Sequence, residues 1–297
     1  MSLLSRERSE FFHISESQTE SLFEPKVFFN CLGKSLSSNK ETGQISEIVE
    51  LPPEWKGIHD SGLGTLEIFI LKGSLICDLE ILGAGSFLAI PVDNGTFSLK
   101  TQTNTDLFIV YSPHFSKNDF YNGEIFVAQN YDRNWSTTEF PGEISSSNQL
   151  HGVLSQSLRW PDPIVDGVHG SNNGLLRLVC IAPGFIGDNR QESHPDCWEE
   201  IFWLSGDFFM PGTGLQAPGS YLTNPPGHIH GPLVSQKGSV MLVHTDSPAG
   251  FDFHEPPIDR ALLENHLEGQ SWMTPPTHQS VSSDLNSHDF QLGVVKR

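Results

Sequence analysis

Two histidines and one glutamate in the second half of the chain are residue types that can bind a metal. His194 and Glu199 belong to a polar turn that leads into the apolar run 201–204, and His230 closely follows a Pro-Pro-Gly sequence. A strand cannot continue its ladder through Pro-Pro-Gly, so we expect His230 to be held on a tight turn. Imidazole and carboxylate groups are both ligands for divalent transition metals. The three side chains could therefore meet around one metal ion.

The elements that would position these residues are short strands. Apolar runs separated by Gly and by Asn or Asp turns are typical of a β-sandwich or barrel, and they predict an all-β fold. The expected strands lie at 27–29, 45–51, 66–71, 75–82, 86–90, 97–100, 107–111, 175–182, 199–204, 219–222 and 239–245. One helix is expected at residues 258–267, where apolar residues share one face.

The segment around His194 resembles the first motif of the cupin superfamily. That motif is His-x-His, three or four residues, Glu, six residues and Gly. His194, Glu199 and Gly206 match its second His, its Glu and its Gly, while Glu192 replaces its first His. The resemblance implies that His194 and Glu199 are metal ligands.

The segment that ends at His230 resembles the second cupin motif, which is Gly, five residues, Pro-x-Gly, two residues and His. Gly219, Pro225, Gly227 and His230 match it without a gap, and Val234 stands where the motif ends in Asn. The resemblance makes His230 the third ligand. It also implies one bound divalent metal, with Fe(II) favoured and Zn(II), Mn(II) or Ni(II) as alternatives.

An internal repeat indicates that the barrel occurs twice. Residues 67–73 match residues 200–206, and residues 85–91 match residues 219–225, at offsets of 133 and 134 residues. The chain therefore resembles a bicupin. The expected fold is two tandem cupin barrels, each a double-stranded β-helix or jelly roll, followed by a short C-terminal helix.

The first copy lacks the metal ligands. Ser61, Leu66 and Thr96 stand at its three ligand positions, and the nearby His59 has no ligand partner in the sequence. These residues bind metal poorly or not at all. We expect the first barrel to be metal-free and structural.

Further catalytic candidates flank the predicted ligands. Glu192 is expected to be either an additional ligand or a catalytic base, and His228 a fourth ligand, a proton shuttle or a solvated turn residue. Glu199 is preferred to Glu200 as the ligand because Glu67, in the copy without metal, is the counterpart of Glu200. Glu200 should then have a role independent of metal, such as a hydrogen bond at the start of the strand.

Aromatic residues near the ligands are candidates for the substrate pocket. By default these are ordinary aromatic residues of a barrel or pocket wall: Trp198, Trp203 and Tyr221. With a metal beside them, some of them should contact substrate. His244 and His254 are expected to be structural histidines.

Composition restricts the class of partner. The 297 residues carry 17 basic and 36 acidic side chains, a net charge of −19 that repels nucleic acid and anionic membranes. A small-molecule substrate is the expected partner, with a homodimer left open. No apolar run reaches the roughly 20 residues of a membrane span, the first residues are too polar for a signal peptide, and the four cysteines show no paired spacing. We therefore expect a cytoplasmic protein with reduced thiols.

These observations predict five segments: an N-terminal arm (1–25), a barrel without metal (26–130), a linker with an entering strand (131–152), a metal-binding barrel (153–256), and a helix with a wrapping tail (257–297). Two histidines and one carboxylate form the ligand set of non-haem Fe(II) oxygenases. The resemblance to cupin dioxygenases implies oxidation of a small enolic or phenolic metabolite. The alternatives are a non-redox metal-dependent isomerase, cyclase, lyase or hydrolase, and a non-enzymatic cupin that senses a metal or metabolite.

Overall fold

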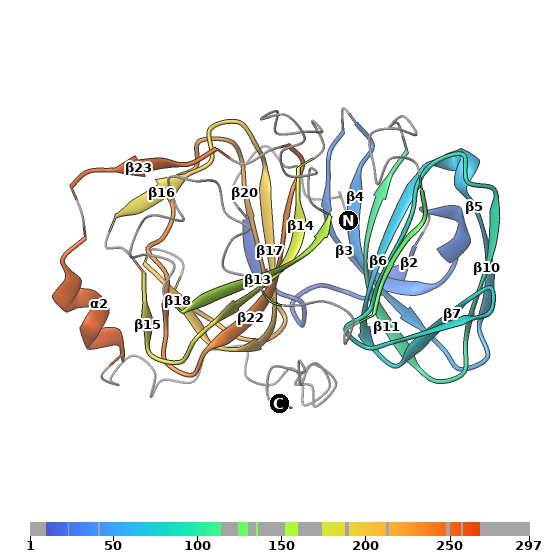
Figure 1. The fold of residues 1–297 in the computed structure, drawn as a ribbon, viewed down its shortest axis with the longest axis horizontal. Helices are drawn as coiled ribbons and strands as arrows, with labels where there is room; N and C mark the ends of the chain where they lie inside the picture. Colours follow the sequence, from blue (N-terminus) through green and yellow to red (C-terminus); the bar gives the residue numbers. More distant parts are fainter. Residues whose placement is uncertain are drawn as a thin grey trace. The chain divides into compact units, whose positions relative to one another are not determined.

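The computed structural model describes residues 10–22, 24–40, 42–113, 124–129, 135, 152–159, 174–187, 190–211, 214–247, 250–256 and 258–267. The chain divides into two compact units (Figure 1). Nearly every described element is a strand, and the α-helix among them is α2 (Arg260–Leu267). The expected strand at 27–29 is wrong, because the chain forms the 3-10 helix η1 (Lys26–Phe28) there. The predicted all-β class with a short C-terminal helix is confirmed.

The first unit contains two antiparallel sheets. Seven strands follow the order β12-β9-β6-β11-β4-β3-β2, and four follow the order β5-β10-β7-β8. Their bounds are β2 (Glu20–Ser21), β3 (Leu32–Ser38), β4 (Ile45–Leu51), β5 (Lys56–Asp60), β6 (Thr65–Lys72), β7 (Ser74–Cys77), β8 (Glu80–Gly83), β9 (Phe87–Ile90), β10 (Thr96–Thr101), β11 (Thr105–Ser112) and β12 (Phe126–Ala128). Alternate residues of β6 and β11 enter one apolar core because successive strand side chains point to opposite faces.

The second unit has a six-stranded sheet of order β1-β20-β17-β22-β14-β13, a four-stranded sheet of order β15-β21-β18-β19, and the pair β16-β23. Their bounds are β1 (Glu10–His13), β13 (Val153–Arg159), β14 (Leu176–Ile181), β15 (Phe185–Ile186), β16 (Gln191–Ser193), β17 (Glu199–Gly206), β18 (Phe208–Met210), β19 (Gly214–Gln216), β20 (Ser220–Asn224), β21 (Val234–Ser235), β22 (Ser239–Thr245) and β23 (Asp252–His254). None of the helices described is long and apolar enough to cross a membrane.

The sequence repeat corresponds to the same strand pairing in both units. β6 lies between β9 and β11, and β17 lies between β20 and β22. The register also agrees, since Leu66 is opposite Ile90 and its counterpart Glu199 is opposite Asn224. The two units are therefore copies of one topology.

A strand from the N-terminal segment joins the second unit. β1 pairs with β20, so that Phe11 is opposite Leu222 and Phe12 is opposite Tyr221. The rings of Phe12 and Tyr221 lie 5.2 Å apart, and Phe11 packs against the barrel core. An N-terminal arm was expected over residues 1–25, but the pairing of its strand with one more than 200 positions away could not be read from the local pattern.

Candidate metal centre

Backbone hydrogen bonds bring the two ligand-bearing segments together. The amide N–H of Glu192 donates to the carbonyl of His230 at 2.9 Å, and the amide of His230 donates to the carbonyl of Glu192 at the same distance. The amide of Gly227 also donates to the carbonyl of His194 at 2.8 Å. Gly227 has a φ of +76°, which a glycine adopts without strain at this turn. His194 and His230 are thereby placed on adjacent pieces of backbone.

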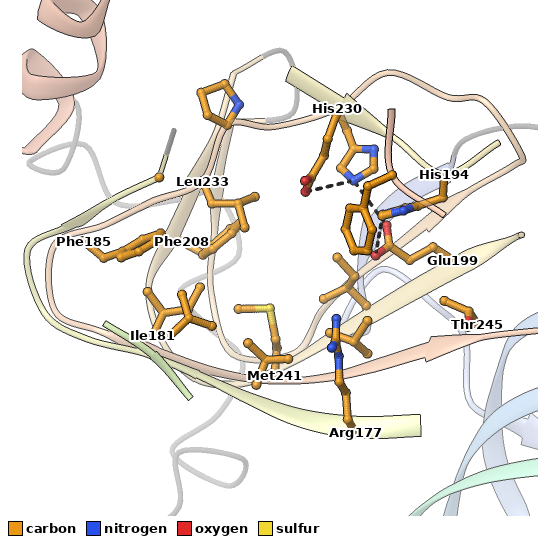
Figure 2. Close-up of a pocket in the computed structure, with 18 of the residues that line it drawn as sticks. Arg177, Ile181, Phe185, His194, Glu199, Phe208, His230, Leu233, Met241 and Thr245 are labelled. Atoms are coloured by element: carbon orange, nitrogen blue, oxygen red, sulfur yellow. Dashed lines mark ion pairs between the residues drawn. The ribbon is translucent and has the colours of Figure 1, made fainter. Parts of the chain in front are cut away.

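The side chains of His194, Glu199 and His230 converge at one point (Figure 2). Nε2 of His194 lies 3.5 Å from Oε1 of Glu199, and Nε2 of His230 lies 3.4 Å from Oε2 of the same carboxylate. All three residues are buried. One glutamate therefore faces both imidazoles.

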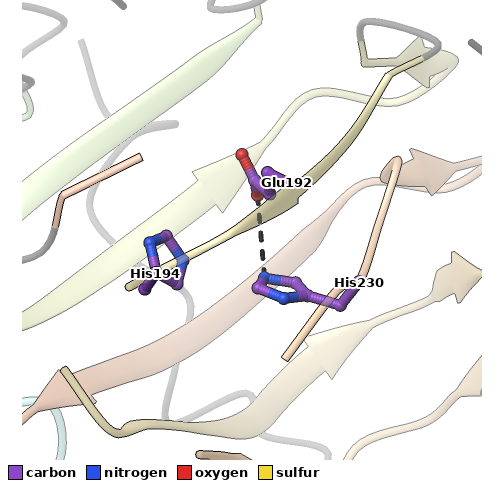
Figure 3. A group of neighbouring side chains, drawn as sticks. All are labelled: Glu192, His194 and His230. Carbon is purple, nitrogen blue, oxygen red and sulfur yellow. Dashed lines mark ion pairs between the residues drawn. The ribbon is translucent and has the colours of Figure 1, made fainter. Parts of the chain in front are cut away.

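Glu192 approaches the same cluster from β16 (Figure 3). Its Oε1 lies 3.8 Å from Nε2 of His230, and one ligand atom from each of Glu192, His194 and His230 lies within 4.8 Å of the others. The Glu192 side chain is 22% exposed, whereas those of the two histidines are 5% exposed. Glu192 is thus the most accessible of the four groups.

The imidazole rings are oriented by hydrogen bonds on their far side. Nδ1 of His194 donates to the carbonyl of Gly250 at 2.8 Å, and Nδ1 of His230 donates to the carbonyl of His228 at 3.0 Å. When the imidazoles are neutral, these bonds leave both Nε2 atoms as electron-pair donors. Asn224 donates to Oε2 of Glu199 at 3.2 Å. Metal-binding histidines in proteins are usually held in this way.

The charges of the cluster are strongly coupled. Burial raises the pKa of Glu199, but the charge and hydrogen bond of His194, together with the charge of His230, outweigh burial and lower the pKa to about 2. Burial lowers the pKa of His194, but Glu199 and Glu192 raise it to about 9. These shifts favour the charged imidazole beside the charged carboxylate, and a metal ion would have to displace the imidazole proton.

The donor set fits a divalent transition-metal ion. Two imidazole nitrogens and a carboxylate converge in a buried position, their orientation is fixed by further hydrogen bonds, and Glu192 supplies a second carboxylate beside them. His194, Glu199 and His230 would hold the ion, with Glu192 as an additional ligand or as a free base.

The cluster lies at one side of a pocket inside the barrel. The pocket holds about 120 Å³ of free space and is lined mainly by apolar side chains. These include Val153, Leu175, Val179, Ile181, Phe185, Ile201, Phe208, Leu233, Met241, Val243 and Phe251. Arg177 and Arg190 are the two arginines that line it. A small ligand in this pocket would be largely removed from water and would lie beside the cluster.

Comparisons with known proteins identify the fold. No family model matches the chain, and the search of curated proteins found no match. Among solved structures, a "putative dioxygenase" from Nostoc punctiforme superposes with a TM-score of 0.65 at 18% identity, covering 84% of this chain and 87% of that one. A "putative glyoxylate induced protein" from Pseudomonas aeruginosa gives a TM-score of 0.60 at 15% identity, covering 87% and 94%. The oxalate decarboxylase of Lactobacillus farciminis gives 0.52 at 12% identity, covering 89% and 94%. These structures have the cupin fold, and at such identities the likeness concerns the fold alone.

The chain folds as a bicupin. The expected tandem of cupin barrels is confirmed, and the cluster lies in the second of them.

Two further residues considered as ligands from the sequence, His228 and Glu200, have side chains that lie apart from the cluster. The side chain of His228 is exposed, and its contact with the cluster is made by its backbone carbonyl. Glu200 is buried on the other face of β17, where it accepts hydrogen bonds from the hydroxyl of Tyr221 and from Nδ1 of His244, the latter at 2.5 Å. Glu199 and Glu200 thus point to opposite faces of one strand, as alternation requires.

None of the three aromatic residues offered as substrate-pocket candidates, Trp198, Trp203 and Tyr221, is among the residues that line this pocket. Trp198 is buried and makes an edge contact with the ring of His244 at 5.8 Å. Tyr221 faces Glu200 on the other side of the sheet. Trp203 points into the barrel but packs in its core against Phe208 at 5.5 Å. Strand alternation directs Tyr221 to the other side of the sheet, whereas Trp203 lies on the barrel side and is taken up by core packing.

Sequence reasoning missed Arg177, Arg190 and Phe251, which do line the pocket. Phe251 makes an edge contact with the ring of His194 at 4.6 Å. For Arg177 a signal existed, because it occupies an alternate position between the apolar residues Leu175 and Val179. This pattern places one arginine on the barrel-facing side of β14.

In the first barrel the counterpart positions have other roles. The hydroxyl of Ser61 donates to the carbonyl of Gly95 and accepts from the amide of Asn94, while Leu66 belongs to the apolar core. Among the residues that the structure describes, the potential metal cluster is the one in the second barrel. His59 is buried, and burial lowers its pKa to about 4, with Asp60 opposing the shift.

Proposed function

We propose that the second barrel is the catalytic unit of a metal-dependent enzyme, a non-haem Fe(II) dioxygenase that acts on a small enolic or phenolic metabolite. The observation that carries this proposal is the convergence of His194, Glu199 and His230 beside a mainly apolar pocket. Two histidines and one carboxylate leave several coordination positions of a metal open, as in the Fe(II) oxygenases.

The pocket and the residues around it have separate tasks. Bound Fe(II) would supply a binding point for substrate oxygens and redox chemistry with dioxygen. The apolar walls, including Ile201, Val243 and Phe251, would exclude water from the reacting atoms. The carbonyls of Gly250 and His228 keep both Nε2 atoms directed at the site. Glu192, as the most accessible carboxylate, would accept the proton that an enol or phenol loses on binding.

One observation favours a second candidate, a non-redox isomerase, cyclase, lyase or hydrolase. Glu192 stands where the cupin motif has a histidine, and its carboxylate is both close to the cluster and partly exposed. A base in this position could move a proton between substrate atoms while the metal acts as a Lewis acid.

Metal substitution tests the two candidates. Protein loaded anaerobically with Fe(II), or with Zn(II), is given a panel of enols and catechols, and oxygen uptake and product formation are followed. The dioxygenase proposal predicts turnover by the Fe(II) form with oxygen, and none by the Zn(II) form, because zinc has no redox chemistry. Turnover by the Zn(II) form without oxygen would contradict it and support the second candidate. No turnover by either form would contradict both.

A matched pair of variants ties the activity to the site. His230→Ala should remove both metal and turnover, because it deletes one of the Nε2 ligands. His254→Gln is the control, since His254 hydrogen-bonds Ser193 at 2.8 Å and is not part of the cluster. Retention of metal by His230→Ala would show that the ion is held elsewhere.

A further inference from the structure

We propose that Arg177 binds a carboxylate of the substrate, so that the pocket selects an acidic metabolite with a metal-chelating oxygen pair at one end and a carboxylate at the other. The metal-chelating end of such a substrate rests on the proposed function, because it needs the metal. The carboxylate end rests on Arg177 alone.

The position of Arg177 is set by β14. The residue is opposite Val243 of β22, and both line the pocket. Its side chain extends from β14 into the pocket with the guanidinium directed toward the side where Glu199 lies (Figure 2). The residue is 7% exposed. A buried guanidinium therefore faces the space that a ligand would occupy.

The strand register gives the scale of the ligand. On β22, Glu199 is opposite Thr245 and Arg177 is opposite Val243, so their partners are two residues apart. Strand β22 lies between β17, which carries Glu199, and β14, which carries Arg177. Strands about 4.8 Å apart with a rise of about 3.4 Å per residue place the two Cα atoms roughly 12 Å apart. Both side chains point into the pocket, so one ring or a short chain can span the gap. The free space of about 120 Å³ is of the order of the roughly 150 Å³ cavity that binds benzene.

The chemistry of the pocket favours a carboxylate at this point. A guanidinium presents its N–H groups in a planar fork that matches the two oxygens of a carboxylate. Apolar neighbours such as Val179, Ile201 and Val243 lower the local dielectric, which strengthens this interaction. These apolar walls would contact the middle of the ligand.

Arg190 provides an internal comparison. It also lines the pocket, but it is half-buried and its guanidinium carbon lies 4.6 Å from the ring centre of Phe253. Arg190 directly precedes β16, the strand that carries Glu192, so it belongs to the same chain segment as Glu192. We therefore assign carboxylate recognition to Arg177 rather than to Arg190.

Two probes of equal shape test the assignment. 3,4-Dihydroxybenzoate carries a chelating catechol and a carboxylate, and 3,4-dihydroxybenzamide replaces the carboxylate by a neutral amide. Titration calorimetry on the Zn(II)-loaded protein, which does not oxidise the probes, measures both dissociation constants. The wild type should prefer the benzoate by about tenfold or more. Arg177→Met should remove the preference by weakening benzoate binding, and Arg177→Lys should retain part of it. Arg190→Met should keep most of it.

The ratio of the two dissociation constants is insensitive to folding defects, because a damaged pocket would weaken the binding of both probes. An equal affinity of the wild type for both probes, or an unchanged preference in Arg177→Met, would overturn the assignment. The same titrations on metal-free protein separate it from the proposed function. If the protein holds no metal, the metal proposal fails, and the effect of Arg177→Met on the benzoate preference still decides the role of Arg177.

Discussion

The adjacent residues Glu199 and Glu200 allow a sharp test of which carboxylate serves the metal and which serves the fold. Glu200 and His244 are each 1% exposed, and Nδ1 of His244 donates a hydrogen bond to Oε1 of Glu200 at 2.5 Å. Losing a buried hydrogen bond to a charged group costs about 1.5 to 3 kcal/mol, and more where the remaining partner is left unsatisfied. Glutamine keeps the shape and one acceptor oxygen, so we expect Glu200→Gln to cost about 2 to 4 kcal/mol, or roughly 5 to 15 °C in the melting temperature of the second unit.

Metal-dependent thermal shifts separate the two roles. A ligand present at 100 times its dissociation constant stabilises the folded state by about 2.7 kcal/mol. Wild type and Glu200→Gln should therefore show similar rises in melting temperature on adding Zn(II), although the variant starts lower. Glu199→Gln should lose most of that rise because it removes the carboxylate that faces both histidines. Calorimetry with and without metal measures both quantities.

Tyr221→Phe is the graded control, since it removes one hydrogen bond to Glu200 and keeps the carboxylate. It should cost about 1 to 2 kcal/mol and leave the metal-dependent rise intact. If Glu200→Gln abolished the rise while Glu199→Gln preserved it, the assignment of the two carboxylates would be reversed and the reasoning from strand alternation refuted.

Three further predictions concern stoichiometry and pH. Elemental analysis of the fully loaded protein should give one metal per chain, and His230→Ala should reduce it nearly to zero. Burial raises the pKa of Glu47 to about 8, helped by Glu20 and Glu24 against a hydrogen bond from Ser35; the folded state then binds the extra proton, and stability should fall as pH rises from about 4.5 to 8. The loss should be up to roughly 4 kcal/mol and be absent in Glu47→Gln, as urea unfolding at pH 5 and pH 9 would show. The lowered pKa of His59 acts in the opposite sense, so stability should fall by up to about 3 kcal/mol as pH drops from 6.5 through 4.

Local sequence spacing anticipated the features that depend on short segments. The cupin spacing identified His194, Glu199 and His230, and the structure brings these three together. The repeat anticipated the shared topology because each copy preserves a strand, a turn and a partner strand. The preference for Glu199 over Glu200 rested on comparing the two copies, and the structure places the two carboxylates on opposite faces of β17.

Features that depend on distant strands were not anticipated. The pairing of β1 with β20 is decided by an open sheet edge, which local periodicity does not reveal. The pocket lining needs both the order of strands across the sheet and the side to which each residue points. Arg177 was missed for this reason, and Tyr221 was assigned to the pocket although its strand position directs it away.

Glu192 and Arg177 are linked by the charge of the site. With a histidine at position 192, a divalent ion and one glutamate would leave one positive charge to attract an anionic substrate. With Glu192 present, the charges of two carboxylates cancel that of the ion, and the Coulomb attraction for a substrate anion weakens accordingly. In the arrangement that we propose, Arg177 would supply a positively charged group in the lining of the pocket, and it would bind one end of the substrate while the cluster binds the other. If both proposals hold, the departure from the cupin motif at Glu192 and the buried Arg177 would be two parts of one arrangement for an acidic substrate.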